Sequence, residues 1–241
     1  MLLNFLIFVL FEYFINLVAN KLYFETLIMV RDVFSYLLSF LLIHLICKRK
    51  LSNYRFKFEN YKIIALAILA AIMLDFGIGL PFYHLIPKPF FFQPDLTGLL
   101  PRLNTIVVAL ILAPFFEELI MRGVILDGLL KNKGAKTAIL ISAILFTLMH
   151  LSVEKIPSLF FGSIFIGWIY YKTKSLMLPI LIHLFNNLIS IYQLYFFKDL
   201  RVGKDGIDSI YGDHTILIIV VFNLILITSL YFLNRQFKKS E

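Results

Sequence analysis

Long, uninterrupted apolar runs are the feature that most constrains how this chain can fold. Sixty per cent of its 241 residues are hydrophobic, against about 45–50% in an average soluble domain. A soluble core of this size could not absorb the excess, and most runs approach the roughly 20 residues that cross a bilayer. The sequence therefore predicts an all-α, polytopic membrane protein with about eight spans. The predicted spans are residues 2–20, 24–47, 63–83, 105–130, 137–152, 156–171, 176–197 and 214–234.

These spans are expected to form one integral membrane domain over residues 1–241, because no linker, internal repeat or low-complexity tract separates them. Met1–Val18 has no basic n-region and no convincing small-residue cleavage site after it, so we interpret it as the first span rather than as a signal peptide. The single Cys47 excludes an intramolecular disulfide. We expect a multi-pass protein of a cell membrane, and the richness in Phe, Ile, Leu and Lys suggests a bacterial plasma membrane.

The distribution of basic residues predicts how the spans are oriented. With eight spans, segments 48–62, 131–136 and 172–175 share one side of the membrane with the C-terminus, and this side carries 14 of the 23 Lys and Arg. The opposite side carries eight, together with eight acidic residues. Because cytoplasmic loops are enriched in Lys and Arg, both termini are expected in the cytoplasm. The net charge of +8 then indicates contact with membrane lipids rather than with nucleic acid.

Ionisable residues inside the predicted spans are the candidates for function, since each costs roughly 2.5–3.5 kcal/mol at the centre of a helix. The fourth span carries Glu117, Glu118 and Arg122. Glu118 and Arg122 are four residues apart on one helical face, in the order that favours an ion pair. Glu117 lies about 100° around the helix and is left outside that pair. We therefore expect Glu118 and Arg122 to support the site and Glu117 to act as a general base. Pro114 predicts a kink just before the two acids.

Two other spans carry polar side chains at a comparable depth. His150 follows Phe146 by four residues and Asn187 follows His183 by four, so each pair shares a helical face, while Asn186 is expected to point elsewhere. At a rise of 1.5 Å per residue, these side chains fall within the hydrocarbon layer of about 30 Å. A lone His or Asn inside a membrane is often an interhelical hydrogen-bond partner. Three polar groups at one depth favour a shared site instead.

The order of these motifs resembles that of the CPBP family of intramembrane peptidases, the CAAX-protease and bacteriocin-processing (Abi) family that includes the type II CAAX prenyl endopeptidases. The matching stretches are Glu117-Glu118-Leu-Ile-Met-Arg122, Phe146-Thr-Leu-Met-His150 and His183-Leu-Phe-Asn-Asn187. The resemblance covers about 105–195, which we expect to be the catalytic core helices.

The resemblance implies hydrolysis of a peptide bond within the membrane. Glu117 and His150 inherit the activation of water, and His183 and Asn187 inherit the stabilisation of the oxyanion. The expected substrate is a membrane-associated peptide, prenylated or bacteriocin-related, that reaches the site from the cytoplasmic side.

Several alternatives stay open from the sequence. Glu117, His150 and His183 could form a three-ligand zinc site, although metal-free catalysis is favoured and the chain has no His-Glu-x-x-His. The family's link with bacteriocin self-immunity implies a second function, that of a non-catalytic immunity or regulatory membrane protein. A transporter is disfavoured because the chain has no inverted repeat. Asp75 in the third span is expected to be a helix–helix contact, and the oligomeric state is undetermined.

Overall fold

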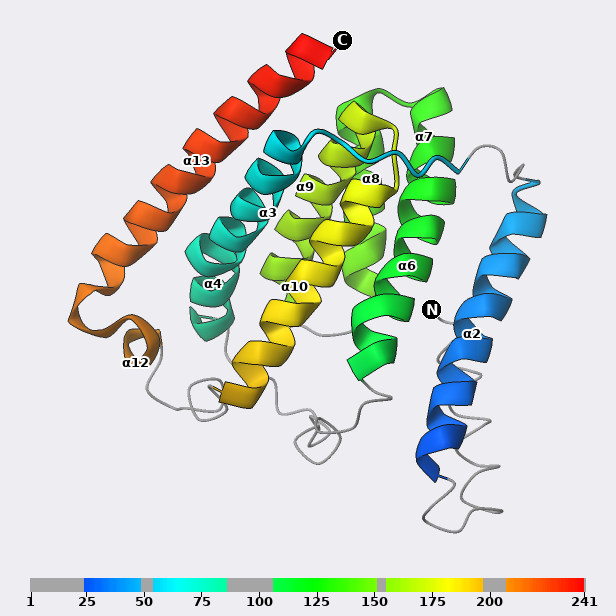
Figure 1. The fold of residues 1–241 in the computed structure, drawn as a ribbon, viewed down its shortest axis with the longest axis horizontal. Coiled ribbons are helices and arrows are strands. Elements are labelled where there is room, and N and C mark those ends of the chain that lie inside the picture. The colour runs from blue at the N-terminus through cyan, green and yellow to red at the C-terminus, as the bar shows by residue number, and fades with distance from the viewer. Residues whose placement is uncertain (1–23, 49–53, 86–105, 151–154, 197–206, 241) are drawn as a thin grey trace.

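The computed structural model describes residues 24–48, 54–85, 106–150, 155–196 and 207–240. Within these residues the chain is helical and has no strand, so the expected all-α class is confirmed for this part. The helices stand side by side in a bundle (Figure 1). The predicted first span, residues 2–20, lies outside the described residues.

The helices follow the remaining predicted spans along the sequence. They are α2 (Phe24–Ile46), α3 (Tyr61–Leu74), α4 (Leu80–Leu85), α6 (Ala113–Glu118), α7 (Asp127–Asn132), α8 (Ala135–Met149), α9 (Ile156–Thr173), α10 (Met177–Phe196), α12 (Asp208–Tyr211) and α13 (Thr215–Ser240). In the described part of the chain, two helical segments, Tyr61–His84 and Gly212–Lys239, are long and apolar enough to cross a membrane, and three shorter helices are apolar too. The count of eight spans and the cytoplasmic termini stay predictions.

Two continuous helices, residues 61–85 and residues 106–132, contain π-helical turns, in which the backbone hydrogen bonds reach five residues back. We call these two continuous helices rods. The rod that ends in α7 contains two of them, Val108–Leu112 before α6 and Leu119–Leu126 after it. A third turn, Asp75–Gly79, lies between α3 and α4. Such turns widen the helix and are frequent at functional sites. Glu117 and Glu118 therefore occupy a short α-helical segment between two widened turns.

Pro114 gives a physical reason for the first of these turns. The N–H of Ala113 bonds to the carbonyl of Val108, five residues back. In that register the carbonyl of Ala109 would need an N–H at position 114, which proline lacks. The kink expected just before the two acids is thus a π-helical turn that leaves one carbonyl for a partner from another helix.

Three groups of buried apolar residues lie in the described part of the bundle, and the two larger ones join most of its helices. One joins α3, α9, α10 and α13, where Ala67, Ala70 and Ala71 are buried and allow the neighbouring helices to approach closely. The other group contains Leu126, Ala138, Ile139, Tyr170 and Leu176, which join the rod of α6 and α7 to α8, α9 and the start of α10.

The two ends of the bundle differ in their content of Lys and Arg, because 12 of the 15 Lys and Arg among the described residues lie at one end. One end, which we call the basic end, is formed by the segment 54–60, the turns at 133–134 and 174–176, and the C-terminus of α13 (Figure 1). The opposite end is formed by the C-termini of α4 and α10 and by the N-termini of α9 and α13. All the helices that contribute to the predicted site run between these two ends.

Candidate active site

The three predicted motifs meet inside the bundle although they are far apart in the sequence. Glu117 lies on α6, His150 caps the end of α8, and His183 lies on α10. The Nε2 atoms of His150 and His183 are each 3.9 Å from Oε2 of Glu117. The structure thus places one carboxylate oxygen between two imidazole rings, at distances longer than a direct hydrogen bond.

The predicted ion pair between Glu118 and Arg122 is present and completely buried. Nη1 of Arg122 donates to Oε1 of Glu118 at 2.9 Å, and both side chains are 0% exposed. Nη2 of the same guanidinium donates to the hydroxyl of Ser163 on α9 at 2.9 Å and to its carbonyl at 3.2 Å. Arg122 therefore ties the rod of α6 to α9.

Glu118 also holds His183, a contact that the sequence did not predict. Nδ1 of His183 is 2.8 Å from the same Oε1 that pairs with Arg122. A carboxylate in an ion pair can only accept, so the proton of this hydrogen bond belongs to Nδ1. The ring consequently presents Nε2 toward Glu117. No sequence spacing could indicate this contact, because its partners lie on two helices that only tertiary packing brings together.

His150 is oriented in a similar way by its own helix. Its Nδ1 lies 2.8 Å from the carbonyl of Phe146, and since a carbonyl can only accept, Nδ1 again carries the proton. The ring of Phe146 packs against His150 with centroids 4.5 Å apart and against His183 at 5.8 Å, and the Arg122 guanidinium lies 5.0 Å from its centroid. Phe146 thus packs against both histidine rings and against the guanidinium of Arg122.

Glu117 has a further partner on α2. Its Oε1 accepts from the Tyr36 hydroxyl at 3.3 Å, which leaves Oε2 directed at the two histidines. The sequence analysis missed Tyr36. A single tyrosine in an apolar span, 81 residues from Glu117, gives no spacing signal that would connect it with the acid.

Asn187 reaches the carbonyl that Pro114 leaves without a helical partner. Its Nδ2 donates to Ala109 at 2.8 Å, so one of its two amide hydrogens is used and the other is available. Asn186, expected to point elsewhere, also lines the cavity described below, with its Oδ1 buried and without a hydrogen-bond partner among the described residues. That expectation was wrong, because neighbouring positions only about 100° apart can both border a wide cavity.

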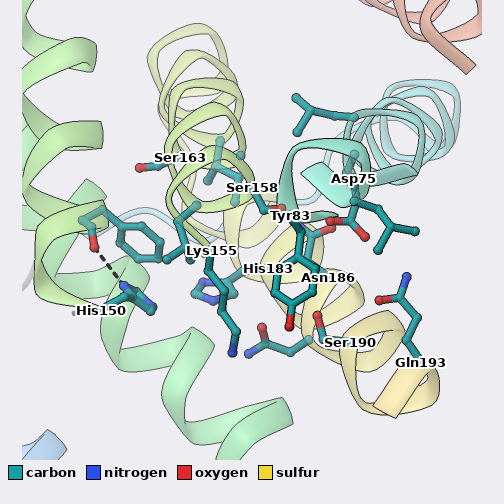
Figure 2. Close-up of a pocket in the computed structure, with 18 residues that line it drawn as sticks. Asp75, Tyr83, His150, Lys155, Ser158, Ser163, His183, Asn186, Ser190 and Gln193 are labelled. Atoms are coloured by element: carbon teal, nitrogen blue, oxygen red, sulfur yellow. Dashed lines mark hydrogen bonds between the residues drawn. The ribbon is translucent and has the colours of Figure 1, made fainter. Parts of the chain in front are cut away.

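A cavity of about 250 Å³ lies beside the histidines (Figure 2). His150, His183 and Asn187 form part of its wall, whereas Glu117 is not among the lining residues and lies 3.9 Å from both histidines. The volume is below the roughly 300–1,000 Å³ of a pocket for a drug-sized ligand. The other polar lining residues are Asp75, Tyr83, Lys155, Ser158, Ser163, Asn186, Ser190 and Gln193.

The geometry does not fit the zinc alternative well. A tetrahedral zinc ion with bonds of about 2.0–2.1 Å holds its ligand atoms about 3.3–3.4 Å apart. Glu117 and each histidine are separated by 3.9 Å, and the described residues include no group of three or more His, Cys, Asp or Glu side chains arranged to hold a metal ion. We therefore derive no step through a metal.

The comparisons with known proteins agree with the motifs. Residues 100–189 match the family model "type II CAAX prenyl endopeptidase Rce1-like", and this stretch contains all six predicted site residues. The resemblance expected from the motifs is thus confirmed over this part of the chain. No match was found among curated proteins or among solved structures.

Proposed function

Residues 100–189 match the family of type II CAAX prenyl endopeptidases. From this premise we propose that the chain is a multi-pass protein of a cell membrane and acts as an intramembrane endopeptidase. One observation carries the proposal: Oε2 of Glu117 lies between the Nε2 atoms of His150 and His183 at equal distances of 3.9 Å. Polar atoms at this separation are suited to a bridging water.

In this proposal a water bound between Glu117 and His150 is the nucleophile. Both atoms that face it can accept its protons, since the Nδ1 proton of His150 is already donated to Phe146. The water oxygen attacks the peptide carbonyl carbon while one water proton passes to Glu117 or His150. The C–N bond then breaks, and the same proton passes to the leaving amine. The products are a new C-terminal carboxylic acid, which then loses the second water proton to become a carboxylate, and a new amino terminus.

His183 and Asn187 are the proposed donors to the oxyanion that forms on the carbonyl. Asn187 has one amide hydrogen beyond the one it gives to Ala109. His183 can donate through Nε2 only as an imidazolium, because its other proton is held by Glu118. Preorganised donors of this kind have a large effect in a site that excludes water.

The proposed substrate is a membrane-associated peptide, with prenylated CAAX peptides and bacteriocin-related peptides as the first to be assayed. Replacing Glu117 with Gln keeps the size of the side chain and removes its basicity. We expect Glu117→Gln to lower the turnover of a cleaved peptide by about 10²–10⁴-fold, measured on purified protein in proteoliposomes. Asp213→Asn, the same chemical change at an exposed position, serves as the matched control and should leave turnover unchanged.

Full turnover by Glu117→Gln, at wild-type levels in the membrane, would contradict this mechanism. A second result would favour the non-catalytic alternative. If Glu117→Ala and His150→Ala both retained full protection of cells against a bacteriocin, while the wild type cleaved no peptide, immunity through binding would replace hydrolysis.

A further inference from the structure

The cavity occupies only one half of the bundle, between the histidines and the end opposite the basic end. Its lining on α10 runs from His183 to Gln193 and on α9 from Lys155, just before the helix, to Ile166. On the rod of α3 and α4 it runs from Ala71 to Tyr83. All three stretches lie in the part of each helix nearer the opposite end (Figure 1).

The lining of the cavity reaches that opposite end through polar residues, and we call this part of the lining its mouth. Lys155 at the N-terminus of α9 is exposed, and Tyr83 near the end of α4 is half-buried. Figure 2 shows the side chains of Lys155, Tyr83 and Asn186 directed at the same space beside the histidines. Polar side chains thus continue from the histidines to the surface of the bundle.

Toward the basic end the site is closed by apolar packing. Leu126, Ile169 and Leu176 are at most 1% exposed, and Tyr170 is 4% exposed. These residues lie near the C-terminus of the rod of α6, near the end of α9 and just before α10. The completely buried ion pair of Glu118 and Arg122 lies on the same side of the histidines. A peptide could not pass from the basic end to Glu117 without unpacking this layer.

The charge pattern assigns these two ends to the two sides of the membrane. The basic end collects 12 of the 15 Lys and Arg in the part of the chain that the structure describes, and the positive-inside rule places an end enriched in this way in the cytoplasm. We infer that the active-site cavity opens on the extracytoplasmic side, so that its substrate is a peptide exposed at the outer leaflet or exported beyond it. This inference rests on the proposed peptidase function and replaces the cytoplasmic access expected from the sequence.

Thiol labelling tests the inference without measuring catalysis. The single native Cys47 is exposed at the basic end, so the wild-type chain reports that end by itself. In a Cys47→Ser background, Lys155→Cys reports the cavity mouth and Asp213→Cys reports the surface of the same end. Lys133→Cys, in the turn between α7 and α8, is the matched control for the basic end.

In spheroplasts of a bacterial expression host, a membrane-impermeant sulfonated maleimide should label the cysteines at 155 and 213. The cysteines at 47 and 133 should react only after permeabilisation. The reverse pattern, or labelling of both ends in intact spheroplasts, would overturn the inference. Labelling at 213 with no reaction at 155, even after permeabilisation, would show that the mouth is closed and would overturn it as well.

A second measurement connects the labelling with the substrate. Intact spheroplasts should cleave an externally added peptide substrate without detergent, and a bulky maleimide on the cysteine at 155 should abolish this cleavage. The same reagent should leave the activity of the wild-type chain, with Cys47 protected, unchanged. If Glu117→Gln retained activity, the proposed mechanism would fail while the labelling pattern would still stand, so the two failures are distinguishable.

Discussion

At the scale of single residues, the centre of the site is a chain of charged and polar contacts from Ser163 through Arg122 and Glu118 to His183. The ion pair in this chain is not built for stability alone. Oε2 of Glu118 and Nε of Arg122 are buried without a hydrogen-bond partner among the described residues, and a buried pair with unsatisfied atoms is weak support for a fold. The contact of Glu118 with His183 favours a role of this ion pair in orienting the imidazole ring.

The first prediction at this scale concerns Arg122. Arg122→Gln should destabilise the protein by about 3–5 kcal/mol, because it leaves the carboxylate of Glu118 buried without its cation. The measurement is a thermal unfolding transition of the purified protein in detergent. Replacing both partners, as in Glu118→Gln with Arg122→Met, should recover part of the loss since no charge then stays buried.

Lys133→Gln provides the matched control for the loss of one cation, because Lys133 is exposed in the turn after α7. It should change stability by less than about 0.5 kcal/mol. An Arg122→Gln protein as stable as this control would contradict a structural role for the buried pair of Glu118 and Arg122.

At the scale of secondary-structure elements, π-helical turns supply the carbonyls through which separate helices are joined. The turn before α6 offers Ala109 to Asn187. The turn Asp75–Gly79 offers the carbonyl of Phe76 to the hydroxyl of Tyr211 and that of Gly77 to Asn223. Burial, together with the nearby Asp75 carboxylate, raises the pKa of Tyr211, so its hydroxyl remains a donor at neutral pH. In both rods a widened turn is satisfied by a side chain from a distant helix.

Pro114→Ala tests whether the first turn positions Asn187. Alanine restores an N–H that can compete for the carbonyl of Ala109, so Asn187 should lose its anchor. We expect kcat to fall by about tenfold to a hundredfold, less than the 10²–10³-fold of a lost oxyanion donor, with KM little changed. Steady-state kinetics on a cleaved peptide provides the measurement.

A double-variant cycle separates positioning from general damage to the helix. If Pro114 acts through Asn187, Pro114→Ala should have no further effect on kcat in an Asn187→Ala background. Pro157→Ala is the control, because Pro157 lies in the first turn of α9, where a backbone N–H has no helical partner. Additive losses in the cycle would contradict the assignment.

At the scale of the whole molecule, the outer surface of the bundle is apolar where the helices face away from one another. On α13, Ile216 is 79% and Ile227 is 63% exposed, and on α2 Leu45 is 67% exposed. Exposed side chains of this size over whole helical faces suit contact with lipid. These exposed faces explain why many apolar residues of the chain lie outside the buried core.

Lysine placed at two depths of α13 tests that the helix spans the bilayer. Ile227 lies near the middle of α13 and Ile216 near its start. Ile227→Lys should disfavour membrane insertion by about 3–4 kcal/mol, whereas Ile216→Lys should cost little because its amine can reach the interface. The fraction of each variant recovered in carbonate-washed membranes measures the difference. Equal recovery of both at wild-type level would place this face of α13 in water.

The sequence by itself determined the helical class of the described residues and the ion pair, and it predicted most of the residues that meet at the candidate site. Apolar runs and spacings of four residues depend only on local geometry, so the helices and the pairing of Glu118 with Arg122 could be derived from the order of residues. The family motifs extended the prediction to His150, His183 and Asn187, all of which lie within the stretch 100–189 that matches the family model. Residue spacing also indicated the effect of Pro114.

Only the tertiary structure decided which atoms face one another and where the cavity opens. The contacts of Tyr36 with Glu117 and of His183 with Glu118 join helices that are 81 and 65 residues apart in sequence. Their formation depends on the rotation of each helix and on packing between helices, which no local spacing specifies. The side from which the cavity can be reached likewise follows from the buried layer around Leu126 and Leu176, because closure is a property of several helices packed together.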